Sequence, residues 1–479
     1  ESRGLGDVYK RQYTNRCGKP VDELWTNLGP EVINISYTGS RSIIHRVIQI
    51  DFSSISAFLT GFSTYPQPLR LRLRIFTIFF LYKQTHQTVR KGELSTIMKL
   101  VFDKADLVKS VGIAMKAVSG KTTMPILECI LIDASSNVIK FTSNDMELGI
   151  ETIVTGMILE RGIVALDAKI FSEIVRKLPD NQVTIETDEN LVTTITCEKA
   201  KFNIPGQSGE DFSYLPILET SDCVSISQFT LKELIRQTIF SIAANENNKL
   251  MTGELFEIKD NTLRVVSLDG HRIAIRRIEL KDSYPDRKVV VPGKTLNEIS
   301  KILSGEMDDQ IDIYFSENHI MFKFDDTTVV SRLIDGEYFR IDQMLSSDYE
   351  TKVTINKKEF LSCIDRATLL VKEGDKKPII IDIQDGAMEL QINSAMGSMK
   401  EEIDINKEGK DIMIGFNPKF LIDALRVIDD EEISIYLVNP KAPCFIRNEE
   451  ESYIYLILPV NFNSVRSVSY THLTLPTIA

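Results

Sequence analysis

Three lysines recur at the same place in three helical patterns, at intervals of 125 residues. Lys169 lies in DAKIFSEIVRKL, Lys294 in PGKTLNEISKIL and Lys419 in NPKFLIDALRVI. Each follows a turn-forming or capping residue and precedes apolar residues at helical spacing; in the last segment Asn417 is the expected N-cap, before Pro418. Ammonium groups placed alike on three helices could contact phosphate, whereas the alternative for any one of them is an ordinary solvent-facing lysine.

No catalytic motif accompanies these lysines. The sequence contains no P-loop, HExxH, GxSxG or GxGxxG pattern. His271 lies in DGHR, but a lone histidine beside an aspartate is more often a turn or packing residue, and no nucleophile motif or second metal ligand is apparent nearby. Six cysteines without a CxxC pair indicate reduced, mostly buried thiols. We therefore expect a protein that is not an enzyme and has no metal or cofactor.

The chain is acidic, yet its predicted helices are basic. Residues 98–463 carry a net charge of −19. The predicted helices are 104–119, 167–177, 231–243, 292–304, 357–371 and 418–428. Together they hold +7, and the rest of this region holds −26. An acidic body argues against tight charge-driven binding of nucleic acid, but basic helices on one face would attract a polyanion there. Without an aromatic ladder, recognition helix or zinc finger, the expected contact is with phosphates and independent of sequence.

The two ends of the chain differ from its body. ESRGLGDVYKRQ at the start and SVSYTHLTLPTIA at the end resemble translated sequencing-adapter read-through, and the segment before Met98 lacks sustained periodicity. We interpret 1–97 and 464–479 as non-native segments, with Met98 as the natural start; the alternative is a basic N-terminal arm or small extra domain. No stretch approaches the ~20 apolar residues of a membrane span and no signal pattern is evident, so we expect a cytoplasmic protein.

From Met98 the sequence reads as three copies of one α+β unit. Each copy opens with a strand and a helix, continues through further strands, adds the helix that carries the recurring lysine, and ends in a hairpin-like pair of strands. We expect domains at 98–220, 224–346 and 351–463, each with two helices packed on antiparallel sheet. A period of this length is typical of a triplicated domain and not of a solenoid.

From MKLVFDKADL at Met98 to YIYLILPVNFN ending at Asn463, the chain resembles the bacterial sliding clamp family, the beta subunits of DNA polymerase III. The match covers 366 of 479 residues, and its most specific pieces are GKTTMPIL, SLDGHRIAI, LIDGEYF and LPVNF. The resemblance implies a homodimeric ring, each subunit forming half, with helices around duplex DNA and sheets outside. It implies a processivity factor that slides on DNA without sequence preference and tethers replicative polymerase, clamp loader, mismatch-repair and other proteins. The acidic body fits such a ring, because topology rather than affinity retains it.

The resemblance also implies three sets of residues. For DNA contact they are Lys121, Lys169, Arg176, Asn245, Lys249, Lys294, Lys301, Lys419 and Arg426, of which Lys121, Asn245 and Lys249 match loop positions of the family and the others follow the repeat and charge pattern. For a hydrophobic cleft between domains 2 and 3 that takes short partner motifs, they are Met251, Leu268, Gly270, His271, Arg272, Ile273, Met344, Asn417, Phe420, Leu456, Leu458, Pro459 and Val460. For the dimer contact, they are Phe202 and Ile204 against Leu369 and Leu370 of the other subunit.

Each of these assignments has a simpler structural alternative. Each apolar residue in these sets would also fit a domain core. The family often has Pro where Phe339 stands, and a basic residue where Asn461 stands. Two other functions are a monomeric peptide-binding scaffold that closes no ring, and an enzyme whose chemistry lies in residues 1–97.

Overall fold

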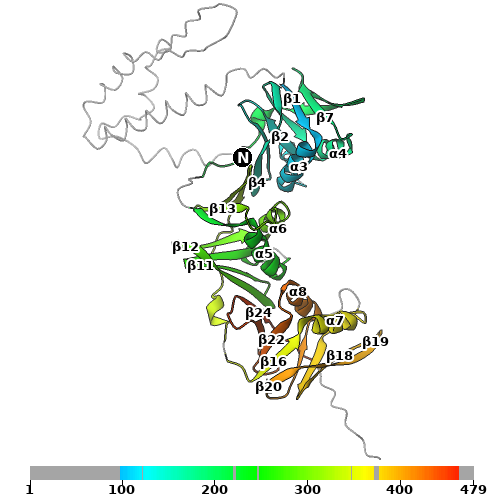
Figure 1. The fold of residues 1–479 in the computed structure, drawn as a ribbon, viewed down its shortest axis with the longest axis vertical. Coiled ribbons are helices and arrows are strands. Elements are labelled where there is room, and N and C mark those ends of the chain that lie inside the picture. Colours follow the sequence, from blue (N-terminus) through cyan, green and yellow to red (C-terminus); the bar gives the residue numbers. More distant parts are fainter. Residues whose placement is uncertain are drawn as a thin grey trace, which may run out of the picture. The chain divides into compact units, whose positions relative to one another are not determined.

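The computed structural model describes residues 98–120, 122–218, 223–244, 248–346, 348–371 and 377–462. The segments 1–97 and 464–479, interpreted above as non-native, lie outside the described residues. Within the described part, α+β repeats follow one another along the chain (Figure 1). No helix there is long and apolar enough to cross a membrane.

The first repeat contains two α-helices and nine strands. Its elements are β1 (Met98–Asp103), α3 (Lys104–Ala114), η5 (Met115–Ala117), η6 (Pro125–Glu128), β2 (Cys129–Asp133), β3 (Ile139–Asn144), β4 (Leu148–Val154), β5 (Met157–Glu160), β6 (Ile163–Asp167), α4 (Ala168–Lys177), β7 (Gln182–Thr187), β8 (Val192–Cys197), β9 (Ala200–Gln207) and η7 (Gly209–Asp211).

The second repeat has longer central strands. Its elements are β10 (Cys223–Ser227), α5 (Gln228–Thr238), η8 (Ile239–Ser241), η9 (Lys249–Thr252), β11 (Gly253–Leu268), β12 (Arg272–Pro292), α6 (Gly293–Ser300), β13 (Gln310–Phe315), β14 (His319–Phe324), β15 (Thr327–Arg332) and η10 (Ile341–Gln343).

The third repeat again places one helix early and one late. Its elements are β16 (Thr351–Asn356), α7 (Lys357–Thr368), β17 (Ile379–Gln384), β18 (Ala387–Ser394), β19 (Gly397–Asp404), β20 (Asn406–Gly409), β21 (Ile412–Phe416), α8 (Pro418–Val427), β22 (Glu432–Leu437), β23 (Cys444–Arg447) and β24 (Tyr453–Ile457).

Antiparallel ladders join neighbouring repeats. Strand β4 of the first repeat pairs with β15 of the second, where Thr152 lies opposite Thr327 and their hydroxyls are 3.0 Å apart. Strand β12 of the second repeat pairs with β24 of the third, with Ile273 opposite Leu456. Backbone hydrogen bonds, rather than side-chain contacts alone, therefore connect each repeat to the next.

The sequence predicted all six α-helices of the described residues, but several of them have different bounds: α3 ends at Ala114 and continues as η5, α5 runs from Gln228 to Thr238 and continues as η8, and α6 is shorter. Asn417 caps α8 by accepting from Lys419 N (3.1 Å), as predicted. Asp167, expected only to be a turn-forming or capping residue, caps α4 by accepting from Ile170 N (2.8 Å). The predicted helix 292–304 ends earlier, at Ser300, with Lys301 as its C-cap. Directly after Ser300 the backbone hydrogen bonds of Lys301 and Ile302 are of the three-residue, 3₁₀ type, and Gly305 adopts a left-handed conformation (φ 81°), so the chain leaves the helix axis.

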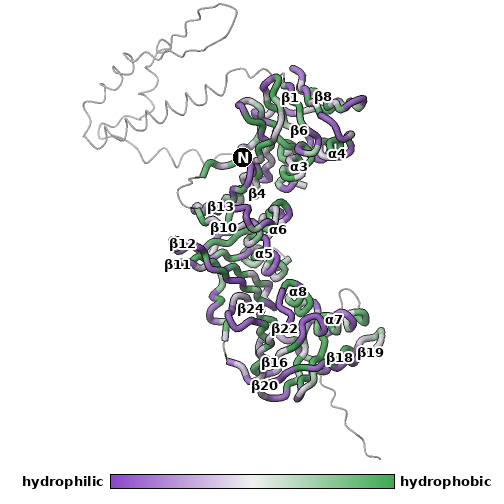
Figure 2. Tube along the Cα trace, in the orientation of Figure 1, coloured by the Kyte–Doolittle hydropathy of each residue, from purple (hydrophilic) through white to green (hydrophobic). Residues whose placement is uncertain are grey.

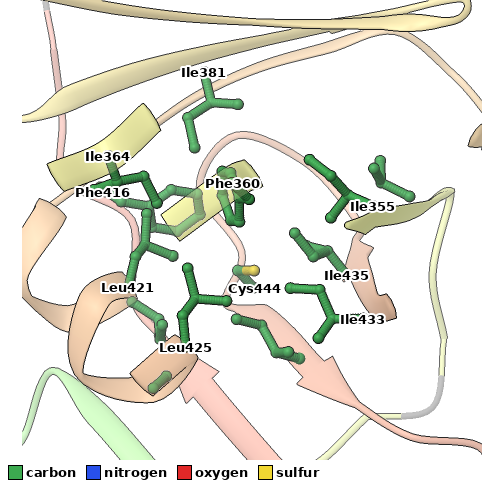
Figure 3. Close-up of a cluster of buried hydrophobic side chains, with 14 of the residues drawn as sticks. Ile355, Phe360, Ile364, Ile381, Phe416, Leu421, Leu425, Ile433, Ile435 and Cys444 are labelled. Atoms are coloured by element: carbon green, nitrogen blue, oxygen red, sulfur yellow. The ribbon is translucent and has the colours of Figure 1, made fainter. Parts of the chain in front are cut away.

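Apolar clusters fill each repeat and also cross from one repeat to the next, since the cluster of Leu268 and Ile273 includes Leu456 of the third repeat. In the third repeat Phe360 and Ile364 of α7, with Leu421 and Leu425 of α8, lie against the strands (Figure 3). Hydrophobic and hydrophilic residues intermix along all the described elements instead of separating into one apolar segment (Figure 2). Helices on one face of antiparallel sheet give the α+β class that the sequence predicted.

Candidate functional site

The three recurring lysines occupy equivalent positions. Lys169, Lys294 and Lys419 are each the second residue of a helix, in α4, α6 and α8 respectively, and all three are exposed. The N-terminal end of a helix carries partial positive charge, so a lysine gains no stability from the helix dipole there. The same dipole adds to the attraction of the ammonium group for an anion.

The basic residues of these helices differ in how free they are. Lys294 forms an ion pair with Asp145 of the first repeat, whose side chain is only 5% exposed. Lys301 is paired with Glu298 (2.7 Å) and Arg426 with Asp365 (3.4 Å). These carboxylates compensate part of the positive charge that would otherwise face an anion.

The remaining predicted DNA contacts are less constrained. Among the residues that the structure describes, Lys169 and Lys419 take part in no ion pair. Arg176 donates from Nε to Ser172 O (3.2 Å), and Lys249 lies exposed on η9. Lys121 and Asn245 lie outside the described residues.

A tight turn explains the DGHR segment. The Asp269 carboxylate accepts from the backbone N–H groups of His271 (3.0 Å) and Arg272 (3.1 Å), and Gly270 takes a left-handed φ of 83°. His271 is exposed, its ring lies 5.9 Å from that of Phe420, and its carbonyl accepts from Leu458 N (2.8 Å). The turn thus brings β12, α8 and the segment after β24 together.

Arg272 links the second and third repeats beneath this turn. The residue is 7% exposed, and its guanidinium contacts Asp269 (3.0 Å), Asp423 of α8 (2.7 Å) and Phe240 O (2.6 Å). Its Cζ also lies 4.6 Å from the ring centroid of Phe420. Such a buried, multiply bonded arginine fixes the position of α8 relative to the β11–β12 turn.

The predicted apolar residues are partly core and partly surface. Leu268, Ile273 and Leu456 are buried in one cluster, against which Met251 and Phe339 pack. Met344 and Leu458 are exposed by 46% and 38%. Asn417, Phe420, Pro459 and Val460 are half-buried, and Val460 N donates to Gly415 O (2.8 Å). The structure therefore joins Leu268, Ile273, Leu456 and Met251 in one cluster, and the ring contact of His271 with Phe420 connects the turn to α8.

The four residues predicted at the subunit contact separate into two kinds. Phe202 on β9 is 39% exposed, and Leu369, directly after α7, is 75% exposed. Ile204 is buried in the cluster of its own repeat, and Leu370 packs against the core of the third repeat. Only Phe202 and Leu369 of the four present large exposed apolar surface.

Several contacts between repeats were not predicted from the sequence. Arg236 of α5 holds Glu233 and also Asp429 (3.0 Å) and Val427 O (3.2 Å) of the third repeat. Neither Arg236 nor Asp423 was predicted, because charged helix residues at such spacing look like ordinary surface positions. Glu254 was also missed, although an acidic residue beside the apolar run of LFEI is an available signal.

Possible metal ligands and buried thiols can be located among the described residues. The described residues hold no group of three or more His, Cys, Asp or Glu side chains placed to bind a metal ion. Burial raises the pKa of Cys129 to about 11 and that of Cys444 to about 12. These thiols stay protonated at neutral pH and are poor nucleophiles.

Family models match nearly the whole described region. They are the DNA polymerase III beta subunit N-terminal domain at residues 98–216, its central domain at 225–339 and its C-terminal domain at 342–461. The beta sliding clamp of Staphylococcus epidermidis is 33% identical over 375 residues, which cover 76% of this chain and 99% of that protein.

Solved structures agree. A DNA polymerase III beta subunit from Eubacterium rectale has 72% identity and a TM-score of 0.75, and the DNA polymerase sliding clamp from Bacillus subtilis has 35% identity and a TM-score of 0.74. Each comparison covers 76% of this chain and 100% of the solved one. The chain therefore belongs to the bacterial sliding clamp family, the non-catalytic processivity factors of DNA polymerase III.

Proposed function

We propose that two copies of this chain close head to tail into a ring that encircles duplex DNA and slides on it without sequence preference. The observation that carries the proposal is the equivalent, exposed position of Lys169, Lys294 and Lys419 at the start of one helix in each repeat. A ring needs only weak phosphate attraction, and the ion pairs of Lys294 and Lys301 keep that attraction modest. We also propose 98–220, 224–346 and 351–463 as the domains of the clamp.

We assign the contact between subunits to Phe202 and Leu369, with Leu370 and Ile204 beneath them. Exposed apolar side chains on the first and third repeats suit a head-to-tail contact, because each subunit offers one half of two different junctions. The direct test is the solution mass of the 54.3 kDa chain by sedimentation. We expect a dimer for the wild type and a monomer for Leu369→Asp, with Met307→Asp, also at an exposed position, as a dimeric control.

Retention on DNA tests encirclement separately. A closed ring loaded onto circular DNA stays bound through gel filtration and is released when a restriction enzyme linearises the circle. A wild-type chain that is monomeric, or that leaves circular and linear DNA equally fast, would contradict the ring and favour the peptide-binding scaffold.

We propose that the surface formed by His271, Phe420, Leu458, Met251 and Met344 is the cleft for short linear motifs of replicative polymerase, clamp loader and mismatch-repair proteins. A floor of buried Leu268, Ile273 and Leu456 with adaptable methionines at its edges suits apolar side chains of different shapes.

The cleft is tested by the fluorescence anisotropy of a labelled peptide from the C-terminus of the replicative polymerase. Phe420→Ala should weaken binding at least about tenfold, since large buried aromatic contacts dominate such interfaces. Tyr349→Ala, at an exposed aromatic of the linker before β16, is the control and should bind normally. Equal affinity for both variants would place the motif elsewhere.

A further inference from the structure

Glu254 is a fully buried carboxyl group without a hydrogen-bond partner. It is the second residue of β11, where it lies opposite Val291 of β12. Its exposed fraction is 0%, and neither Oε1 nor Oε2 is hydrogen-bonded. Ser241 Oγ of η8 is also buried and unpartnered. An ionised carboxylate in such a place would lose its hydration without compensation.

Thr238 influences Glu254 less than burial does. Its side chain lowers the pKa of Glu254, whereas burial, the larger cause, raises it. Thr238 Oγ1 donates its proton to Leu234 O (2.6 Å), and neither carboxyl oxygen of Glu254 has a hydrogen-bond partner. Burial therefore decides the balance in favour of the neutral carboxyl group.

Among the described residues, no cation compensates the Glu254 carboxyl group. Burial is the main cause that raises the pKa of Glu254, to about 8, and no charged group among the described residues contributes to the shift. The phenol of Tyr338 responds to Glu254, and its own pKa is raised mainly by burial. The cations on the elements packed against β11 have other partners or face solvent. Arg236, Arg272 and Lys294 form ion pairs with other carboxylates, Lys232 donates to Leu303 O, and Lys249 is exposed.

Glu254 is close to both sides of the junction between η8 and η9, defined here as residues 239–244 and 248–252, because Thr238 directly precedes η8 and Glu254 follows the end of η9 by two residues. The two sides of this junction are joined by the hydrogen bond from Ala243 N to Met251 O (2.8 Å), and η8 contacts β11. Helix α6 packs tightly on the same place, because a Cβ on Gly293 would collide with the Ile242 side chain and the Thr252 carbonyl. A change in the charge of Glu254 should therefore affect the packing on both sides of the junction.

We propose that Glu254 is a proton-binding site of this clamp: its neutral carboxyl group keeps the η8–η9 junction closed, and release of the proton to solvent opens the junction. The group can ionise only if it reaches water, and we assign that access to the parting of η8 and η9, both of which contact β11. The junction carries Lys249 on the predicted DNA side and Met251 on the predicted partner side. The inference does not rest on ring closure or on peptide binding.

Hydrogen exchange of the full chain at several pH values tests the proposal. The reporters are the amides of Ile242, Ala243 and Met251, which donate to Ile239 O, Met251 O and Asn248 O. Dividing the measured exchange rate by the intrinsic rate gives the opening constant of each amide. This constant should rise about tenfold per pH unit between pH 4.5, the ordinary pKa of a glutamate, and about 8, the raised pKa of Glu254, and should then level off. In Glu254→Gln the opening constant should not depend on pH.

Glu257→Gln is the matched control, because Glu257 is on the same strand but is paired with Arg264; it should keep the wild-type slope. A flat wild-type profile, or an equal slope in Glu254→Gln, would overturn the proposal. If Glu254→Gln fails to fold, infrared spectra of the wild type decide the matter. A carbonyl band of a protonated carboxylic acid should persist at pH 7 and vanish by pH 10, and its absence at pH 7 would refute a neutral Glu254.

Discussion

Removing the Arg272 side chain should weaken the joint between the second and third repeats more than removing any exposed arginine. In Arg272→Met the carboxylates of Asp269 and Asp423, 16% and 21% exposed, lose their cation. Phe240 O loses a donor, and the Phe420 ring loses the guanidinium above it. Breaking a buried ion pair by deleting one partner costs about 3–5 kcal/mol, and we expect a loss in that range.

A double-mutant cycle separates the ion pair from the packing. Asp423→Leu in the Arg272→Met background removes the unpaired carboxylate, so the double variant should recover part of the loss. Urea unfolding followed by far-UV circular dichroism gives the free energies, with exchange of α8 amides as a local measure. Arg277→Met is the control, because Arg277 joins the same two repeats through a longer, more exposed pair with Glu451 (3.4 Å) and should cost less than about 1 kcal/mol.

Equal losses for Arg272→Met and Arg277→Met would refute this reasoning. Strict additivity of Arg272→Met and Asp423→Leu would do so as well, since it would mean that the two groups do not interact.

Three further predictions follow from individual contacts. The wild type should lose about 3 kcal/mol of unfolding free energy between pH 4.5 and 7, because the pKa of Glu254 is raised in the folded state, whereas Glu254→Gln should not lose it. Denaturation of both proteins at three pH values checks this difference. Lys169→Ala should lower the slope of log affinity for DNA against log salt by about 1 without loss of stability, whereas Lys294→Ala should instead cost about 1–3 kcal/mol by leaving the buried Asp145 unpaired. Asn417→Ala should cost about 1 kcal/mol by removing the cap of α8, and Asn417→Asp should restore it, as measured by thermal unfolding.

Local features of the fold were predictable from the sequence because they depend on neighbouring residues. The 125-residue spacing of Lys169, Lys294 and Lys419 predicted equivalent helix positions, and Asn417 was recognisable as a cap. The end of α6 was not, since apolar residues continue beyond Ser300 at helical spacing while the backbone follows tertiary packing.

Long-range electrostatics were the part that the sequence could not supply. Arg272 and Asp423 are 151 positions apart, and Lys294 and Asp145 are 149 apart. Only the strand register between repeats brings these pairs together. The number of positively charged helix residues was therefore predictable, but not which of them a carboxylate would neutralise.

The ladder between β4 and β15 can form only late in synthesis. Thr327 of β15 is 175 positions after Thr152 of β4, so the outer edge of β4 has no partner strand until that length of chain has been made. At about 5–20 residues per second, a ribosome leaves that edge open for roughly 10–35 seconds. An unpaired strand edge is a template for pairing with another nascent chain. Growing polypeptides of this clamp are thus most vulnerable to misassembly on polysomes before β15 emerges, when a holding chaperone would be of greatest use.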